Sequence, residues 1–223
     1  AYVNIPALGN STNDARSMAT ILRKLGFQVV EVVDGSKAQM DKAVENLQDL
    51  LKGKQAVAML YYAGHGLQLD WHNYMVPVDA KLTQSSDVPK QTIDIETVIT
   101  SFKKATTRMN IIVLDACRDN PFKSMGRNIG GRGLAPTTAA TGQMVVFSAG
   151  TGQQALDRLG NTDKNKNGVF TRTFLKEMQK PGVSIDRIVK NVRNEVAELA
   201  KTVGHEQVPA IYDQVLGDFY FKK

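Results

Sequence analysis

The chain has 223 residues, of which 42% are hydrophobic and 22% charged. This is the balance of a soluble globular domain and excludes a disordered or fibrous chain. The formal net charge is +6, but the basic residues are scattered without interleaved aromatic residues, so we expect no nucleic-acid partner. No apolar run reaches the roughly 18 residues of a membrane span, so we expect no membrane partner, and no start typical of a signal peptide is present. The composition leaves the cellular compartment undetermined.

Cys117 is the only cysteine of the chain. A disulfide within the chain is therefore excluded, and the residue is either inert packing or a working thiol. Free cysteine is among the most buried residue types, so an isolated cysteine after a strand is more often packing. The residues around Cys117 have to decide between these two interpretations.

The first half of the chain alternates predicted helices and strands. Apolar residues at helical spacing predict helices, and short β-branched or continuously apolar runs predict strands. Gly26 ends the first helix, and Asp34-Gly35 is a turn signal. The predicted helices cover residues 12–25, 36–52 and 93–104, and the predicted strands cover residues 27–33, 56–62 and 110–114.

The second half begins with a long segment that shows no periodicity. Residues 118–142 are rich in glycine and arginine, and a segment of this composition predicts an exposed, mobile link. After it the alternation resumes. The predicted elements are a strand over residues 143–148, helices over residues 169–179 and 184–202, and a closing strand over residues 218–221.

This order of elements predicts an α/β fold with a mostly parallel central sheet and helices on both faces. His65 follows one buried strand and Cys117 follows another. In open parallel sheets, sites form beyond the carboxyl ends of the strands. The fold therefore predicts that the imidazole and the thiol lie close together.

A thiol nucleophile needs a base, donors for the developing oxyanion and a pocket for the substrate side chain. His65 is the candidate base, and its neighbours Gly64 and Gly66 would let a substrate backbone pass closely. The backbone amides of Gly66 and Cys117 are the candidate oxyanion donors. His72 and His205 are not bracketed by glycines, and we assign them structural roles.

At these residues the chain resembles the caspase-like cysteine peptidases, and more specifically their metacaspase, paracaspase and bacterial orthocaspase branches. The resemblance covers most of the chain. It implies a caspase-like three-layer sandwich and a single domain over residues 1–223, with a large-subunit-like part (1–118), a flexible link (119–142) and a small-subunit-like part (143–223). The motifs that carry it are Asn13-Asp14-Ala15, Tyr61-Tyr62-Ala63-Gly64-His65-Gly66, Tyr74-Met75-Val76-Pro77-Val78-Asp79, Asp115-Ala116-Cys117-Arg118, Asn167-Gly168-Val169-Phe170-Thr171 and Gln207-Val208-Pro209.

The family also has a central strand just before the segment that matches Asn13-Asp14-Ala15. Here only residues 1–5 are left to supply it. We therefore expect either a fragment or a strand that belongs to another piece of polypeptide.

The resemblance also implies which residues bind the substrate side chain before the scissile bond, P1. In the family, the acids that match Asp14 and Asp115 form the floor of this S1 pocket. Two carboxylates would repel an acidic P1 residue and attract Arg above Lys, because the planar guanidinium can bind both acids. The alternatives are that Asp14 is a helix cap and that Asp115 only bonds backbone amides.

The implied activity is that of a cysteine endopeptidase cutting after Arg or Lys. Cys117 would attack the scissile carbonyl and His65 would exchange protons with the thiol and the leaving amine. An Arg-specific enzyme could also cut itself in the link, at Arg118, Lys123, Arg127 or Arg132, although a flexible basic loop explains these residues equally well.

We expect no required cofactor and no metal site. Residues 163–168 resemble the start of a calcium loop, but position twelve is Phe174 where a bidentate Glu is needed, so a polar turn is the better interpretation. Some metacaspases are activated by calcium through other acids. Asp79, Asp94 and Glu96 are suitably placed and Ser124 is not an acid, so calcium activation stays open.

Two rival functions keep the same fold. One is a catalytically idle scaffold or binding module, and the other is a nucleic-acid-binding domain that uses Arg127 and Arg132 of the link. The expected partners of the enzyme are proteins or peptides with a basic P1 residue, and we expect a monomer or weak dimer.

Overall fold

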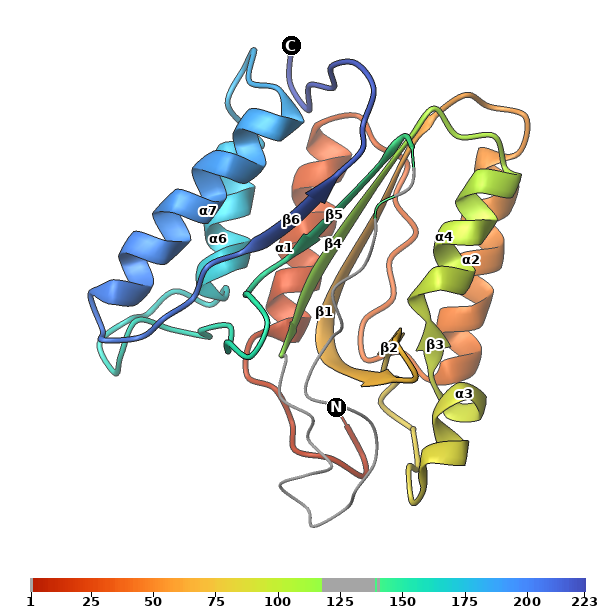
Figure 1. Cartoon of the computed structure of the whole chain (residues 1–223), viewed down its shortest axis with the longest axis horizontal. Helices are drawn as coiled ribbons and strands as arrows, with labels where there is room; N and C mark the ends of the chain where they lie inside the picture. The colour runs from red at the N-terminus through yellow and green to blue at the C-terminus, as the bar shows by residue number, and fades with distance from the viewer. Residues whose placement is uncertain (1, 118–138, 140) are drawn as a thin grey trace.

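The computed structural model describes residues 2–117, 139 and 141–223. Figure 1 shows a twisted sheet that crosses the molecule, with helices on both sides of it. The helices are α1 (Ser11–Lys24), α2 (Lys37–Leu51), the 3₁₀ turn η1 (Ser85–Asp87), α3 (Val88–Gln91), α4 (Ile95–Lys104), α6 (Val169–Glu177) and α7 (Ile185–Lys201). The strands are β1 (Val57–Leu69), β2 (His72–Met75), β3 (Ile93–Asp94), β4 (Met109–Cys117), β5 (Gln143–Phe147) and β6 (Ala210–Asp213).

The six strands form one sheet in the order β3-β2-β1-β4-β5-β6. The three central strands, β1, β4 and β5, are parallel. The outer pairs β1 with β2, β2 with β3, and β5 with β6 are antiparallel. The sheet is therefore mixed, and its parallel part is confined to the centre, where a parallel strand needs cover on both faces.

The two faces of β4 belong to two separate cores. Ile111 and Val113 pack with α1, α6 and α7 on one face, and Ile112 and Leu114 pack with α2 and α4 on the other. Successive side chains of a strand point to opposite faces, so the run of apolar residues predicted for this strand is what both cores require. The result is the expected three-layer sandwich (Figure 1).

The helices agree with their predicted positions to within a residue or two at most ends. α2 begins at a capping box in which Ser36 and Gln39 exchange hydrogen bonds. α7 turns Ile188, Val192 and Val196 inward, as its helical spacing predicts. Among the described residues, no helix is both long and apolar enough to cross a membrane.

The strand predicted over residues 27–33 is absent. The amide of Phe27 still closes α1 by donating to the carbonyl of Leu22, and Asp34 adopts the predicted turn with φ 49°. The residues between them pair with no strand in the described part of the chain. A β-branched run becomes a strand only when a neighbour pairs with its backbone.

The neighbour that could pair with this segment is β1, and one side of β1 is open. β2 reaches only Gly66 and the residues after it. Backbone groups alternate between the two sides of a strand, and the amide and carbonyl of His65 point away from β4, to Tyr2 and Val76. The groups on the same side at Val57, Met59, Tyr61 and Ala63 have no backbone partner within the described residues.

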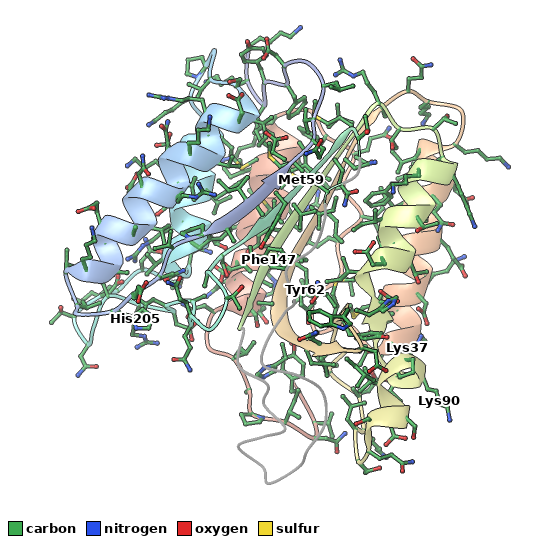
Figure 2. All side chains as sticks on the ribbon, in the orientation of Figure 1. Lys37, Met59, Tyr62, Lys90, Phe147 and His205 are labelled. Carbon is green, nitrogen blue, oxygen red and sulfur yellow. The ribbon has the colours of Figure 1, made fainter. Side chains whose placement is uncertain are left out.

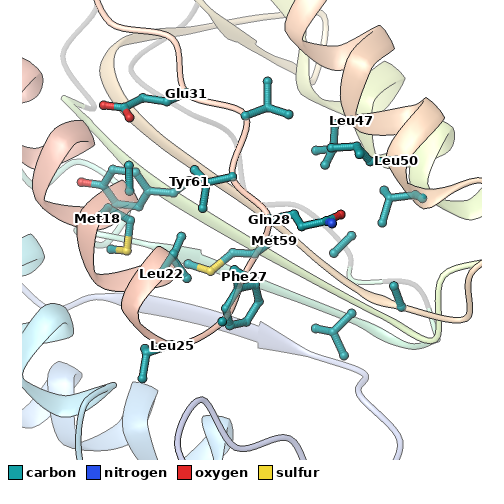
Figure 3. A pocket seen from close by; sticks show the side chains of 18 of the residues that line it. Met18, Leu22, Leu25, Phe27, Gln28, Glu31, Leu47, Leu50, Met59 and Tyr61 are labelled. Carbon is teal, nitrogen blue, oxygen red and sulfur yellow. The ribbon is translucent and has the colours of Figure 1, made fainter.

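Two cavities, of about 360 and 170 Å³, lie along this open edge. Figure 3 shows the larger one, with Met59 and Tyr61 on one wall and Phe27, Leu47 and Leu50 around it. Residues 57 and 59–63 are only partly buried, whereas β5 is fully buried. Within the described residues, no strand covers this edge.

The predicted closing strand over residues 218–221 is also wrong. Tyr220 makes a single bridge to Ser184, and Phe219 and Phe221 pack into the core beside α6 and α7. The strand that closes the sheet is β6, which pairs antiparallel with β5. The aromatic residues that suggested a strand are there for side-chain packing.

Candidate active site

The relative position of His65 and Cys117 is set by the register of β1 and β4. The strand predicted to end at residue 62 continues to Leu69. Within it, His65 is the parallel register partner of Cys117, the last residue of β4. From Gly66 onward β1 pairs with β2 instead. His65 therefore lies where the partner of β1 changes, at the sheet edge that carries sites in α/β folds.

The amide of Gly66 lies on the β4 side of β1, because backbone groups alternate and the amide of His65 points the other way. Cys117 ends β4 on that side. The two amides predicted to hold the oxyanion thus come from neighbouring strand positions. The predicted cleavage residues Arg118, Lys123, Arg127 and Arg132 lie outside the described residues.

The imidazole of His65 is oriented by a backbone carbonyl. The residue is 5% exposed, and its Nε2 lies 2.8 Å from the carbonyl oxygen of Pro6. A carbonyl only accepts, so Nε2 carries the hydrogen and Nδ1 holds the lone pair. Nδ1 is buried and has no partner within the described part of the chain. Burial lowers the pKa of His65 below 6.5, against the Pro6 carbonyl, which raises it. The ring is a neutral base with one nitrogen available.

Two tyrosines hold the backbone of His65. Its amide donates to the hydroxyl of Tyr2 over 2.8 Å, and the hydroxyl of Tyr62 donates to its carbonyl over 2.7 Å. The Tyr2 ring also contacts the imidazole edge-on, with 4.6 Å between centroids. Figure 2 labels Tyr62 at the centre of the sheet, with its side chain beside β1.

Because Gly64 has no side chain, the hydroxyls of Tyr2 and Tyr62 can lie close to its backbone. A Cβ at this position would collide with Tyr62 Oη and would lie 2.7 Å from Tyr2 Oη. We expect Gly64→Ala to displace both tyrosines, and with them His65, and to lower kcat/KM for a peptide substrate about tenfold or more. Steady-state kinetics measure this loss. Gly9→Ala is the control, since its new Cβ would come no closer than 3.8 Å to another atom; equal activity of both variants would contradict the expectation.

Asp14 and Asp115 converge on one point. Asp14 is a residue of α1 and is 4% exposed, and Asp115 lies near the end of β4. A Cβ placed on Gly168 would lie 3.3 Å from Asp14 Oδ2 and 3.8 Å from Asp115 Oδ2. A cavity of about 20 Å³ lies between these residues and Asp157, with room for about one water molecule.

Hydrogen bonds from neighbouring groups hold both carboxylates. Asn167 Nδ2 and the amide of Gly168 donate to Asp14 Oδ1 over 2.8 and 3.0 Å. Thr171 Oγ1 donates to Asp115 Oδ2 over 2.5 Å. Asp14 therefore does not cap α1, the alternative considered from its sequence position, and Asp115 is bonded by a side chain.

Burial and mutual repulsion make this cluster hard to charge. Burial and the charge of Asp115 raise the pKa of Asp14 from 3.8 to about 7, against the hydrogen bonds from Asn167 and Gly168. Burial also raises the pKa of Asp115, against the hydrogen bond from Thr171. The charge of Asp157 raises the pKa of both. Such a cluster gains most from a bound cation.

Residues 163–168, whose sequence resembles the start of a calcium loop, form part of this pocket. Asp163 Oδ1 accepts from the amide of Asn165, whose Oδ1 accepts from the amide of Asn167. Arg172 pairs with Asp163 Oδ2 over 2.7 Å. This chain of turns is the polar turn that the sequence predicted, and it carries Asn167 to Asp14.

Three functional groups were missed by sequence reasoning. The Pro6 carbonyl gives no side-chain signal at all. Asp157 was not among the predicted site residues, and only its position beside Asp14 and Asp115 shows that it lines the cavity. Thr171 is also part of a matched motif, and its bond to Asp115 depends on how α6 packs against β4.

The remaining sequence candidates lie elsewhere. Asp79 Oδ1 accepts from the amide of Lys37, whereas Asp94 accepts from the amide of Glu96 and contacts His72. Figure 2 shows His205 beneath α7, far from Tyr62. The described residues contain no group of three or more His, Cys, Asp or Glu side chains that could hold a metal.

Known proteins resemble the chain in sequence and in fold. The family model of the caspase domain, Peptidase_C14, matches residues 1–220. Mucosa-associated lymphoid tissue lymphoma translocation protein 1 of Homo sapiens is 32% identical over 117 residues, and its Mus musculus homologue is 31% identical over 118 residues. These matches cover 52% and 53% of this chain, and 14% of each relative.

Two solved structures share the fold over nearly the whole chain. Pro-sf-caspase-1 superposes with a TM-score of 0.66 at 15% identity, covering 100% of this chain and 87% of its own. Caspase-1 from Spodoptera frugiperda superposes with a TM-score of 0.64 at 17% identity, covering 98% of this chain and 86% of its own. The α/β sandwich is therefore caspase-like.

Proposed function

Because this chain belongs to the caspase domain family of cysteine peptidases, we propose that it is an endopeptidase that cleaves after Arg or Lys. The convergence of the Asp14 and Asp115 carboxylates on one point carries this proposal. The point lies at the sheet edge where His65 and Cys117 are register partners. A P1 side chain that reaches the acids would bring its own carbonyl near the dyad.

The charge of the pocket supports the choice of a basic residue. A carboxylate in P1 would add a further negative charge to a cluster whose acids already repel one another, at a cost of a few kcal/mol, or a preference of about 100-fold. A guanidinium offers planar paired donors to two carboxylates, and an ammonium offers a point charge, so Arg is preferred to Lys. The cavity of about 20 Å³ has to widen to admit either side chain.

The proposed reaction is acyl transfer. Cys117 attacks the scissile carbonyl carbon as its thiol proton passes to Nδ1 of His65, and the amides of Gly66 and Cys117 bind the oxyanion. The imidazolium then gives this proton to the leaving amine as the C–N bond breaks. Water hydrolyses the thioester and restores the thiol. The cycle uses no cofactor.

Self-processing is part of the same proposal. Arg118, Lys123, Arg127 and Arg132 are basic residues between the two subunit-like parts, and each fits the proposed P1 preference. The substrates are proteins or peptides with an accessible basic residue, and the enzyme acts as a monomer or weak dimer.

Fluorogenic peptides that differ only in P1, with Arg, Lys or Asp, test the proposal. We expect cleavage of the Arg peptide, slower cleavage of the Lys peptide, at least 100-fold slower cleavage of the Asp peptide, and no cleavage by Cys117→Ala. The 223-residue chain is assayed after thermal melting shows that both proteins are folded. Equal signals from wild type and Cys117→Ala would favour an idle scaffold, and a preference for Asp would refute the role of the acids.

A further inference from the structure

We propose that Thr171 and Tyr61 are positioning residues that aim the Asp115 carboxylate into the S1 pocket and thereby set the preference for Arg over Lys. The proposal rests on the proposed function, since it explains how one wall of that pocket is held. It adds two residues that do not touch the substrate, on two elements other than the strand that carries Asp115.

The three side chains form a continuous hydrogen-bonded row. Thr171 Oγ1 lies 2.5 Å from Asp115 Oδ2 and 2.6 Å from Tyr61 Oη. A hydroxyl has one hydrogen, and an ionised carboxylate only accepts. Thr171 therefore donates to Asp115, and the second bond is donated by Tyr61. The row runs from β1 through α6 to the end of β4.

Its environment makes the row rigid. Thr171 is completely buried, and it sits in the first turn of α6, directly after the Asn167 and Gly168 groups that hold Asp14. The same short stretch of chain thus fixes both acids. Burial and the charges of Asp115 and Asp14 raise the pKa of Tyr61 well above 10, so its phenol stays protonated and remains a donor.

The orientation of the Asp115 carboxylate matters more for binding an Arg side chain than for binding a Lys side chain. A guanidinium binds a carboxylate through two donors in one plane, so it loses affinity when the carboxylate turns. An ammonium is a compact charge with rotatable donors and tolerates the turn. If the row fixes the plane of the Asp115 carboxylate, it therefore raises the ratio of kcat/KM for the Arg peptide to that for the Lys peptide. If it only joins α6 to the sheet, it contributes to stability and leaves this ratio unchanged.

The test compares Thr171→Val, Thr171→Ser and Tyr61→Phe in the full chain. Thr171→Val keeps the volume and removes the hydroxyl. We expect it to raise KM for the Arg peptide about tenfold, the typical weight of a hydrogen bond to a charged group, with kcat nearly unchanged, and to reduce the Arg to Lys ratio severalfold. Tyr61→Phe should change KM and the Arg to Lys ratio in the same directions but by less. Thr171→Ser, which keeps the hydroxyl, should have wild-type values of both.

Thr173→Val is the matched control. Thr173 is also buried in α6, but its hydroxyl donates to the carbonyl of Val169, within the helix. If Thr173→Val and Thr171→Val change KM and the Arg to Lys ratio alike, or if neither changes them, the positioning role is wrong. Alkylation of Cys117 by iodoacetamide needs no S1 pocket and should proceed at the wild-type rate in every variant. If the wild-type protein does not cleave the Arg peptide, the proposed function itself is wrong.

Discussion

Replacing Asp115 by Asn should lower kcat/KM for the Arg peptide about 100-fold. The amide has the shape of the carboxylate and can still accept from Thr171, so the change removes little besides the charge. A bound guanidinium then loses one of its two buried anionic partners, and the loss of such a partner costs a few kcal/mol. Steady-state kinetics on the Arg, Lys and neutral P1 peptides measure the effect.

Asp157→Asn is the control for this change. Asp157 lines the same cavity but is solvent-exposed, so water screens its charge and its loss should cost less than tenfold. The rate of Cys117 alkylation should be the same in both variants. An Asp115→Asn enzyme that keeps wild-type kcat/KM for Arg would show that the acid is structural and that the substrate side chain binds elsewhere.

The activity should rise steeply between pH 5 and pH 7. With a pKa of about 7, Asp14 is mostly protonated at pH 5, and a neutral carboxyl does not attract a cation. We expect kcat/KM for the Arg peptide to increase up to about 50-fold over this interval, and Asp14→Asn to give a lower and flatter profile. The groups that face Asp14 are Asp115, Asp157, Asn167 and the amide of Gly168.

The dyad can be separated from the pocket in the same experiment. Burial lowers the pKa of His65 below 6.5, so the imidazole loses its proton at a lower pH than the Asp14 carboxyl, whose pKa is about 7. Iodoacetamide alkylation reports the dyad without the S1 pocket. Parallel pH profiles for alkylation and for Arg cleavage would mean that Asp14 does not govern binding.

Stability should change with pH in the opposite direction. The folded pKa of Asp14 lies above the ordinary value of 3.8, so the native state holds a proton that the unfolded chain releases between about pH 4 and 7. The free energy of unfolding therefore falls as pH rises through this interval, by on the order of 4 kcal/mol. Asp14→Asn should remove the contribution of Asp14 to this slope in chemical denaturation, leaving that of Asp115, whose pKa burial also raises. The charge that activity needs therefore has a cost in stability.

The elements that could be predicted from sequence are those whose pattern reflects their own environment. β4 and β5 are covered on both faces, so they are continuously apolar, and α7 packs one face, so it has helical spacing. The strand predictions over residues 27–33 and 218–221 were wrong because strand formation depends on a partner that lies elsewhere in the chain. Local composition does not contain that information.

The residues of the candidate site also fall into a group that could be predicted from sequence and a group that could not. His65, Cys117, Asp14 and Asp115 have side chains whose chemistry is visible in the sequence, and register and packing bring them to one edge. The groups that hold them were not predictable. The Pro6 carbonyl belongs to the backbone, and Thr171 acts only because the first turn of α6 lies against Asp115.

The open side of β1 has a consequence for the dynamics of the domain. In an ordinary open α/β sheet the marginal strands exchange their amide hydrogens first, because the interior ladder is closed on both sides. Here the amides of Val57, Met59, Tyr61 and Ala63 have no backbone partner on one side, as far as the described chain goes, although β1 lies inside the sheet. We therefore expect the fastest-exchanging amides of the sheet in its interior. One of them belongs to Tyr61, the residue at the start of the row to Asp115.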